Sequence, residues 1–376
     1  MFKEYPSNIP LGTGHNHILQ FDSPRRLTAR VYMRCLSYEA DTWRFWFSNG
    51  VDSTFGGLGA YEAYRDQAGG QWTILSARIG DGGLCQEGFM AEPPAVSGWV
   101  PVTFDGQPGR AVAPLERFWS DEVRLALPEG HWLVWEWELE GNGIPCTPDS
   151  QAATFVAYGG RRLGFDGGDL AFDLMCPMPD RFGARRAVKG HVAFWGDSIT
   201  QGCGTGNNLY GMWAGRIALS LGREYGCWNL GLGWARGSDA ADGQFWAYKA
   251  FQNDVVCIAH GVNDILSGRY GGERGDTARE VLATLRKNIG MLKSRGIRVI
   301  LFTIPPFDYT PEAYEVWRAL RDAYPPLAEE LGVELFDFSA VLDSDPPYGN
   351  RCPYGAHPNA EGGRVVAEAF LEAEMV

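Results

Sequence analysis

The spacing of apolar residues changes once along the chain, near Arg185, and this change limits the folds that are possible. Between Leu27 and Leu139 apolar residues tend to alternate, as in Leu133–Leu139, where Glu136 and Glu138 face the other way. A period of two is typical of half-buried antiparallel strands. Turn sequences rich in Asp, Pro and Gly separate the runs, with no convincing helix between them. The pattern predicts a β-sandwich of jelly-roll type.

Beyond Arg185, short apolar runs alternate with amphipathic helical stretches. The apolar runs lie at His191–Trp195, Cys227–Leu230, Val255–Ala259, Val299–Ile304 and Val333–Phe338. The helical stretches are Tyr210–Leu221, Thr277–Lys293, Pro311–Leu331 and Asn359–Glu374. Strands that alternate with helices favour a parallel sheet covered by helices on both faces, which is a three-layer α/β domain.

A length of 376 residues favours two domains, each large enough to bury its own core. The segment Pro177–Lys189 begins with two prolines and carries four Arg or Lys residues, so it is the expected boundary. We therefore predict an all-β domain over residues 1–185 and an α/β domain over residues 186–376.

Charge and composition exclude several classes of partner. A net charge of −13 without a basic cluster argues against nucleic acid and anionic membranes, which both require grouped Lys or Arg. No run approaches the roughly 20 apolar residues that span a bilayer, and the first residues lack a signal-peptide pattern. The chain as given is expected to be soluble and cytoplasmic. Its eight scattered cysteines are expected to be mostly reduced and buried.

A serine follows the first apolar strand of the second half. The strand 192–195 runs directly into residues 196–202, Gly-Asp-Ser-Ile-Thr-Gln-Gly. Ligands of open parallel sheets bind beyond the carboxyl ends of strands, so Ser198 is delivered to the functional edge. Backbone N–H groups at the start of the next helix would stabilise negative charge there. Taken alone, the segment is equally consistent with a helix cap in a glycine turn.

Three further segments end strands on the same edge or begin the last helix. They are Gly231-Leu232-Gly233, His260-Gly261-Val262-Asn263-Asp264 and His357-Pro358-Asn359. A glycine turn lets a backbone N–H approach a reacting carbonyl, and an asparagine amide can bind an oxyanion. His357 supplies a group that takes a proton near neutral pH. Together with Ser198, these groups are what acyl transfer needs: a nucleophile, an oxyanion hole and a base.

The motifs from about Ala187 to the C-terminus resemble those of the SGNH, or GDSL-type, hydrolase family. Residues 196–202 resemble its first block, 261–264 its third and 357–362 its last. The resemblance implies a flavodoxin-like three-layer fold. It also implies that Ser198 is the nucleophile, that the Ser198 backbone N–H and the Asn263 side chain bind the oxyanion, and that His357 is the base. Asp197, directly before the expected nucleophile, is expected to have a supporting role in the site.

Two departures from the family pattern affect these assignments. Counting from Asn229, the expected oxyanion glycine falls on Trp234, with Gly233 directly before it, so either backbone N–H is a candidate. The usual aspartate three residues before the histidine is replaced by Tyr354. An imidazole needs an acceptor for its second nitrogen. The candidate acceptors are a backbone carbonyl near 351–354, the Tyr354 hydroxyl, or a carboxylate of Asp343, Asp345 or Asp308.

Other features favour structural roles or leave two interpretations open. His15-x-His17 is the one close histidine pair, and without a neighbouring Cys or carboxylate it indicates a surface or interface pair. We therefore expect no metal and no cofactor. His260 either contacts substrate or is satisfied by backbone. Trp195, Trp234 and Trp246 either line a pocket or belong to the core. The eight tryptophans of the first half either stack on sugars or fill the sandwich.

A β-sandwich joined to an SGNH-type domain resembles the two-domain carbohydrate esterases of family two, which also have an incomplete triad. The resemblance implies removal of acetyl or another short acyl group from a hydroxyl of a sugar. An acyltransferase that moves the group to an alcohol is one alternative. A glycan-binding protein with a decayed site is the other. A small-molecule or glycan ester is the expected partner, and the sequence leaves the oligomeric state open, a homo-oligomer included.

Overall fold

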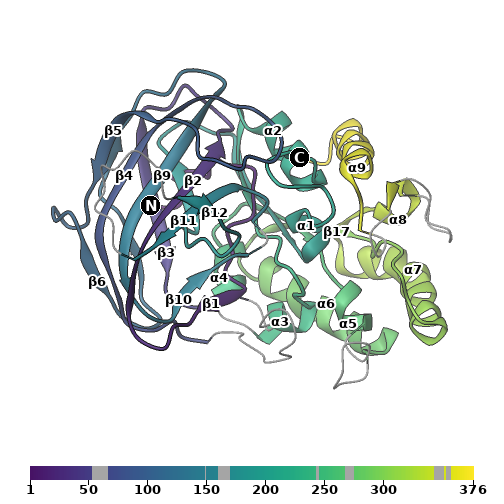
Figure 1. The fold of residues 1–376 in the computed structure, drawn as a ribbon. Coiled ribbons are helices and arrows are strands. Elements are labelled where there is room, and N and C mark those ends of the chain that lie inside the picture. The colour runs from purple at the N-terminus through teal and green to yellow at the C-terminus, as the bar shows by residue number, and fades with distance from the viewer. Residues whose placement is uncertain are drawn as a thin grey trace.

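Two domains of different architecture lie side by side in the computed structural model (Figure 1). The structure describes residues 1–52, 67–148, 150–159, 170–242, 245–266, 275–342, 351–352 and 357–376. The strands up to residue 184 pair in antiparallel fashion, and those from residue 190 onward form a parallel sheet. The predicted change of architecture near Arg185 is therefore confirmed. The predicted boundary falls between β13 and β14, which belong to different sheets.

The N-terminal domain consists of two main antiparallel sheets. The larger has the order β12-β11-β2-β9-β4-β5, with β6 also paired to β4. Its strands are β2 (Arg25–Arg34), β4 (Trp72–Leu84), β5 (Ser97–Val102), β6 (Arg110–Val112), β9 (His131–Gly141), β11 (Ala153–Tyr158) and β12 (Ala171–Phe172). The smaller contains β3 (Thr42–Ser48), β7 (Arg117–Trp119), β8 (Val123–Arg124) and β13 (Arg181–Ala184). A separate pair joins β1 (His17–Leu19) to β10 (Ile144–Cys146).

Aromatic side chains fill the space between these two sheets. Phe45 of β3 lies 4.5 Å from Trp135 of β9, and Phe47 lies 5.5 Å from Trp137, measured between ring centroids. All four side chains are buried in one cluster. Sheets packed face to face over an interdigitated core make a sandwich. The predicted β-sandwich is confirmed, while the jelly-roll order of its strands stays a prediction.

Strand β9 departs from the half-buried pattern that its sequence predicts. Glu136 lies on the face expected to meet solvent, yet it is only 2% exposed. The Nε of Arg30 lies 2.5 Å from Glu136 Oε2, and the Nε of Arg78 lies 2.7 Å from Oε1. The Trp99 ring covers Arg78 at 3.9 Å. Buried charge is tolerated when it is paired, so this face is covered by ion pairs and an aromatic ring rather than by water.

The C-terminal domain has a five-stranded parallel sheet with the order β15-β14-β16-β17-β18. The strands are β14 (Gly190–Gly196), β15 (Tyr225–Asn229), β16 (Val255–Ala259), β17 (Arg298–Phe302) and β18 (Glu334–Phe336). Numbered along the chain, the strands run 2-1-3-4-5, which is the doubly wound flavodoxin-like order. The direction in which successive strands are added to the sheet reverses beside β14, and ligands of such sheets bind at this point.

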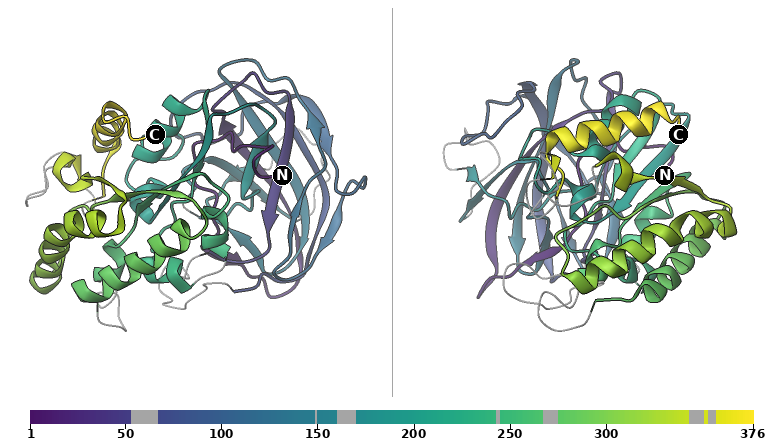
Figure 2. Two further views of the ribbon diagram at one scale, coloured as in Figure 1. Left: turned by 180° about the vertical axis from the view of Figure 1, so that it is seen from behind. Right: turned by 90° about the vertical axis from the view of Figure 1, so that its right-hand side faces the viewer.

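Helices cover both faces of this sheet (Figure 2). On one face α2 (Trp213–Leu221) packs against α9 (Ala360–Glu372), and on the other α6 (Ala278–Lys293) packs against α7 (Pro311–Leu331). These are the four predicted helices. The remaining described helices are short: α1 (Ser198–Gln201), α3 (Gly237–Asp242), α4 (Phe245–Ala250), α5 (Val262–Leu266) and α8 (Phe338–Val341).

The ends of the predicted helices shift by up to three residues for local reasons. Helix α2 begins at Trp213 instead of Tyr210, because Tyr210 has a φ of 51° and its hydroxyl accepts a hydrogen bond from the Arg34 amide. Helix α6 begins after a capping box in which Thr277 and Glu280 satisfy each other's backbone N–H groups. Helix α7 has Thr310 as its cap and Pro311 in its first turn, and it ends at Gly332 in the left-handed conformation.

The two domains meet through close backbone approaches and aromatic rings. A Cβ added to Gly222 would lie 2.5 Å from Leu36 Cβ, and one added to Gly226 would lie 2.5 Å from Pro6 Cβ. Trp46 of the sandwich meets Trp228 of β15 edge to face at 6.2 Å. The interface is therefore packed like a protein interior.

Two predictions from composition can be compared with the structure. All eight cysteines are free thiols, and six of them are buried, as expected for reduced apolar residues. Among the described residues, no helix has the length and apolar character needed to cross a membrane.

Candidate active site

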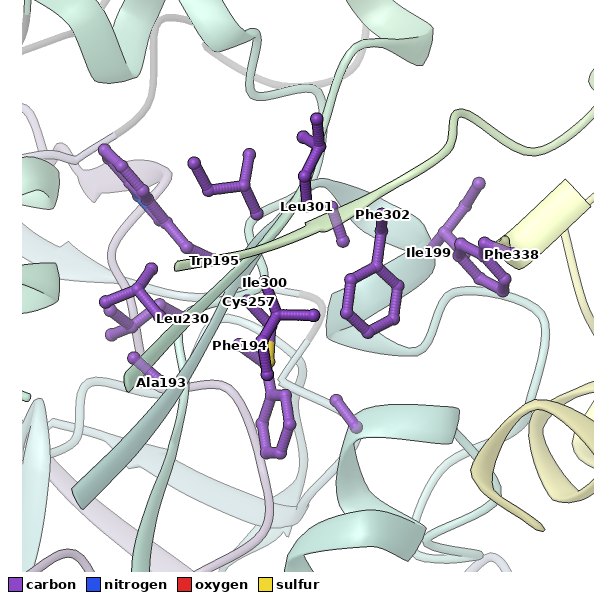
Figure 3. Close-up of a cluster of buried hydrophobic side chains, with 14 of the residues drawn as sticks. Ala193, Phe194, Trp195, Ile199, Leu230, Cys257, Ile300, Leu301, Phe302 and Phe338 are labelled. Atoms are coloured by element: carbon purple, nitrogen blue, oxygen red, sulfur yellow. The ribbon is translucent and has the colours of Figure 1, made fainter. Parts of the chain in front are cut away.

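Ser198 stands in a sharp turn between β14 and α1. The strand ends at Gly196, and the helix begins two residues later. A Cβ on Gly196 would lie 2.0 Å from Thr200 Oγ1, so the turn requires glycine. Asp197 caps the helix, because its Oδ1 accepts a hydrogen bond from the Ile199 amide at 3.0 Å. Ile199 itself belongs to the same buried core cluster as Phe194 (Figure 3), so its side chain anchors the turn in the core.

The structure brings Ser198 and His357 together although 159 residues separate them. Ser198 Oγ lies 2.9 Å from His357 Nε2, and both side chains are partly exposed. His357 precedes α9, whose cap Asn359 accepts a hydrogen bond from the Gly362 amide at 2.9 Å. The Phe307 ring packs edge to face on the imidazole, with centroids 5.0 Å apart. A hydroxyl and an imidazole at this distance have the geometry of a nucleophile and its base.

The acceptor for the second ring nitrogen of His357 stays a prediction. Tyr354, Asp343 and Asp345 lie outside the described residues. The Arg351 carbonyl accepts a hydrogen bond from the Asn359 amide at 2.8 Å, which ties this carbonyl to the start of α9. Asp308, the remaining carboxylate candidate, lies within the described residues and has an exposed side chain.

The loop after β15 packs directly on the turn that carries Ser198. We call residues 230–235, which include the candidate oxyanion donors Gly233 and Trp234, the oxyanion loop. The Leu232 amide donates to the Gly196 carbonyl at 3.0 Å. A Cβ on Gly231 would lie 2.2 Å from the Gln201 amide nitrogen, so this glycine permits the loop to approach α1 closely. Gly233 and Trp234 follow at once, and Trp234 has a φ of 66°. Such a left-handed backbone is uncommon for a bulky residue and gathers at functional sites.

Asn263 lies in the first turn of α5. This helix begins directly after Gly261, which has a φ of 134°. Its Nδ2 donates to the Ala235 carbonyl at 3.0 Å, and the side chain is nearly buried. The amide is thereby joined to the oxyanion loop. Strand β14, which leads to Ser198, lies between β15 and β16. The loops that follow β15 and β16 therefore flank Ser198.

Two buried carboxyl groups lie behind this edge of the sheet. Burial is the main cause that raises the pKa of Asp197 to about 7; the hydrogen bond from the Ile199 amide opposes this rise, and the nearby Asp264 adds to it. Burial also raises the pKa of Asp264, which accepts hydrogen bonds from the Gly237 amide at 2.7 Å and the Ser238 amide at 3.2 Å. Both groups organise backbone near the site.

His260 lies inside the core rather than on the edge where substrate would bind. Its side chain is 3% exposed, and its ring centroid is 5.6 Å from Trp195 and 6.1 Å from Trp246. Burial lowers the pKa of His260 to about 4, so the ring is neutral. This position favours the structural interpretation of His260. Trp195 and Trp246 are likewise core residues, whereas Trp234 is partly exposed.

Phe307 and Gly204 lie near the site and were not singled out by the sequence, and Asn229 served there only as the residue from which positions were counted. Phe307 packs on His357, and Gly204 does so too, since a Cβ on Gly204 would lie 3.2 Å from His357 Cβ. Asn229 binds three segments through its side chain. Asn229 ends a strand on the functional edge, which is a signal that strand prediction supplies. Phe307 and Gly204 lie in loops without a periodic pattern.

Comparison with known proteins gives a family match to the second half of the chain. Residues 194–365 match the model of the GDSL-like lipase/acylhydrolase family. A lipolytic G-D-S-L protein from Veillonella parvula is 21% identical, with a TM-score of 0.42 over 49% of this chain and 98% of its own. A mutant of the acetyl-xylooligosaccharide esterase Axe2 from Geobacillus stearmophilus is 22% identical, with a TM-score of 0.41 over 50% of this chain and 94% of its own. No curated protein matched the chain.

Proposed function

Because the C-terminal part of this chain carries a domain of the GDSL-like lipase/acylhydrolase family, we propose that the protein is a serine esterase. It removes acetyl or another short acyl group from a hydroxyl of a carbohydrate, through an acyl-enzyme on Ser198. The observation that supports the proposal is the 2.9 Å contact between Ser198 Oγ and His357 Nε2. The carbohydrate alcohol is the finer part of the proposal and rests on the resemblance of the two-domain layout to carbohydrate esterases.

The first half of the reaction forms the acyl-enzyme. His357 Nε2 takes the proton of Ser198 as Oγ attacks the ester carbonyl carbon. The carbonyl oxygen becomes an oxyanion, which accepts hydrogen bonds from the Ser198 backbone N–H, the N–H of Gly233 or Trp234, and the Asn263 amide. When the carbon–oxygen bond to the alcohol breaks, the imidazolium of His357 donates its proton to the leaving oxygen. The alcohol departs and the acyl group remains on Ser198.

The second half uses the same groups on water. His357 removes a proton from water, and the resulting hydroxide attacks the acyl carbonyl carbon. The same donors hold the second oxyanion. Collapse of this intermediate returns the proton to Ser198 Oγ and releases the carboxylic acid. Removing one donor of this kind typically costs about 10²–10³ in kcat, so the arrangement of the oxyanion loop contributes to the rate beside the serine and histidine.

Hydrolysis of p-nitrophenyl acetate tests the chemistry. We expect turnover by the wild-type protein and its loss in Ser198→Ala. Ser220→Ala is the matched control, because Ser220 is an exposed serine on α2 whose hydroxyl bonds to the Arg216 carbonyl. No turnover by the wild type, or equal turnover by the wild type and Ser198→Ala, would refute the proposal.

The substrate class needs a second measurement. Acetylated xylooligosaccharides are compared with p-nitrophenyl esters of two, four and eight carbons. We expect release of acetate from the sugar and a fall in kcat/KM as the acyl chain lengthens. Faster cleavage of the eight-carbon ester would contradict a short acyl group.

The two alternatives have their own readouts. An acyltransferase would convert an added alcohol into acylated product in preference to forming free acid. A glycan-binding protein would bind acetylated oligosaccharide without turnover, and Ser198 would not react with an organophosphonate.

A further inference from the structure

Asn229 joins three segments that meet behind the candidate oxyanion hole. Its side chain is fully buried at the end of β15. Its Oδ1 accepts a hydrogen bond from the Gly231 amide at 2.8 Å. Its Nδ2 donates to the Thr200 carbonyl in α1 at 3.2 Å, and to the Pro10 carbonyl at 3.4 Å. One amide therefore connects the oxyanion loop, the nucleophile helix and the N-terminal part of the chain.

The third of these segments belongs to the sandwich side of the molecule. Residues 9–16, which we call the amino-terminal arm, form no helix or strand and are buried throughout. A Cβ on Gly12 would lie 3.1 Å from the Gly231 carbonyl oxygen and 3.7 Å from Gln201 Cγ. A Cβ on Gly14 would lie 3.0 Å from Leu232 Cδ1. The arm thus lies against the oxyanion loop and also reaches Gln201 at the end of α1.

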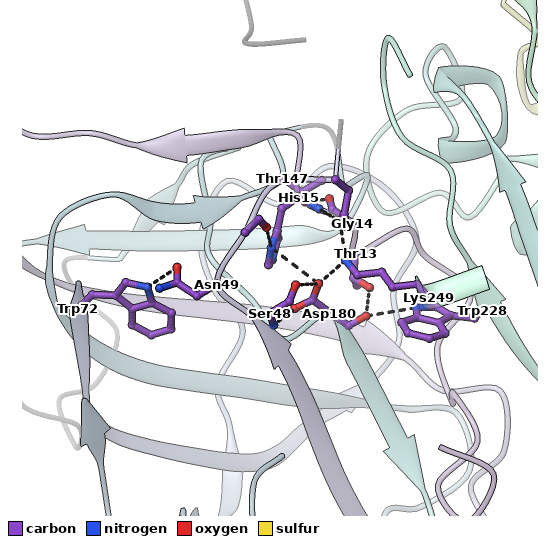
Figure 4. A network of polar contacts seen from close by, with 12 residues as sticks. Thr13, Gly14, His15, Ser48, Asn49, Trp72, Thr147, Asp180, Trp228 and Lys249 are labelled. Carbon is purple, nitrogen blue, oxygen red and sulfur yellow. Dashed lines mark hydrogen bonds and ion pairs between the residues drawn. The ribbon is translucent and has the colours of Figure 1, made fainter. Parts of the chain in front are cut away.

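A buried polar network fixes the far end of the arm (Figure 4). Thr13 Oγ1 donates to the Asp180 carbonyl, and the His15 amide donates to Asp52 Oδ2 at 2.8 Å. The ammonium group of Lys249, on α4, bonds to both Asp52 and Asp180. Asp180 also accepts hydrogen bonds from the Ser48 amide at 2.7 Å and the Ser48 hydroxyl at 2.9 Å in the sandwich.

Lys249 supplies the positive charge that this network needs. His15, Asp52 and Asp180 lie close enough together to hold a metal ion, but the ammonium of Lys249 bonds directly to both carboxylates. Burial by itself would lower the pKa of Lys249, and the two carboxylates outweigh it, so that pKa is raised. The lysine is charged, and it ties the α/β domain to the arm and to the sandwich.

We infer that Asn229 and the amino-terminal arm are positioning elements of the active site, which hold the oxyanion loop at its working distance from Ser198. The inference rests on the proposed esterase function. Neither Asn229 nor the arm is assigned a contact with substrate; both act through the oxyanion loop. The loop packs on α1 so closely that a Cβ at Gly231 has no room, and it packs on the arm tightly enough that a Cβ at Gly12 would displace it by a few tenths of an ångström.

This arrangement has a kinetic consequence. A donor displaced by about 1 Å from a developing oxyanion can cost about 10²-fold in rate, whereas substrate binding in the ground state depends on it less. A defect in the arm should therefore lower kcat more than it changes KM. A merely structural role would instead lower the stability of the whole protein, with kcat following the fraction of folded protein.

Glycine substitutions provide a matched test. Gly12→Ala places a methyl group 3.1 Å from the Gly231 carbonyl, which forces a displacement of a few tenths of an ångström. Gly290→Ala, on α6, is the control, because a Cβ there meets nothing within 4 Å. Asn229→Ala removes the three side-chain bonds and gives a second, independent variant. Steady-state kinetics on p-nitrophenyl acetate are measured beside thermal unfolding of each protein.

We expect kcat to fall about 10- to 100-fold in Asn229→Ala and about 3- to 10-fold in Gly12→Ala, whose displacement is smaller. In both variants KM should change less than about threefold, and the protein should be folded at the assay temperature. Gly290→Ala should keep wild-type kinetics. Hydrogen exchange gives a readout that does not depend on activity: amides of residues 230–235 should exchange faster in Gly12→Ala and Asn229→Ala than in Gly290→Ala.

The outcomes separate this inference from the proposed function. Unchanged kcat in both folded variants overturns the inference, as does a loss of kcat that simply follows a loss of folded protein. If the wild type cleaves no ester, the esterase proposal fails. Exchange in residues 230–235 then decides whether the arm holds the loop, and unchanged exchange in both variants overturns that part too.

Discussion

Asn263 Nδ2 donates to the Ala235 carbonyl at 3.0 Å, so the side chain and the loop that carry the candidate oxyanion donors hold each other in place. Asn263 follows β16 and Ala235 ends the oxyanion loop after β15, and these two strands flank β14. A change at either partner is therefore expected to disturb both groups of donors.

Asn263→Ala is expected to lower kcat of ester hydrolysis by about 10²–10³-fold, because one oxyanion donor is lost and the loop loses a tether. KM should change much less, since the oxyanion exists only during the reaction. Steady-state kinetics on p-nitrophenyl acetate check this result. A rise in KM with kcat intact would instead place Asn263 in substrate binding.

His357→Ala is expected to lower kcat by about 10⁴–10⁶-fold, because Ser198 loses the group that takes its proton. His131→Ala is the matched control, because His131 lies in the sandwich, where its Nδ1 contacts Asp81 Oδ1 at 2.8 Å. The two proteins are compared in the same assay. Comparable losses in both would show that the effect at His357 is not specific.

Asp197 should make stability depend on pH. Burial raises the pKa of Asp197 to about 7 in the folded protein, while the pKa of an aspartate in the unfolded chain is about 3.9. Between these values the folded protein holds a proton that the unfolded chain releases. The contribution of Asp197 to stability is therefore complete below about pH 4 and is lost as pH rises to about 7, by up to about 1.4 kcal/mol per pH unit.

Asp197→Asn removes this titration and keeps a good helix cap. The free energy of unfolding of the variant should gain on that of the wild type as pH rises from 5 to 7. Urea unfolding at several pH values measures the difference. Parallel pH dependence of the two proteins would show that Asp197 does not hold a proton in this range.

Lys249→Met should destabilise the protein by about 3–5 kcal/mol, because it leaves the buried carboxylates of Asp52 and Asp180 without their cation. Adding Asp52→Asn and Asp180→Asn to that change should recover much of the loss, since no buried charge then remains at the two carboxylate positions. Urea unfolding of the single and triple variants is compared with Lys3→Met. Lys3 forms an exposed ion pair with Asp254, so its loss should have little effect. A single variant as stable as the wild type would contradict this account.

The sequence predicted those parts of the molecule that depend on local pattern. The βα alternation predicted the parallel sheet, and the position of Ser198 after the first strand follows from it. The pairing of Ser198 with His357 was expected because their segments lie on one edge of that sheet, and the structure places their reacting atoms 2.9 Å apart.

What the sequence did not predict depends on contacts between distant segments. The alternation in β9 indicated that Glu136 lies on a polar face, but a side-chain period does not reveal whether Arg30, Arg78 and Trp99 cover that face. The amino-terminal arm has no period at all, and its bond to Asn229 spans 219 residues. Tyr210 leaves the predicted helix because of a partner in the other domain.

Gly222 against Leu36 and Gly226 against Pro6 leave no room for a side chain between the domains. Domains of one chain are usually joined by an exposed linker and meet through a polar interface that resembles a transient protein–protein contact. Here the backbones of the two halves approach so closely that glycine is needed at both contacts. The two halves are therefore expected to be inherited together and to unfold together in a single calorimetric transition, so a sandwich taken from an unrelated enzyme would not be a working replacement.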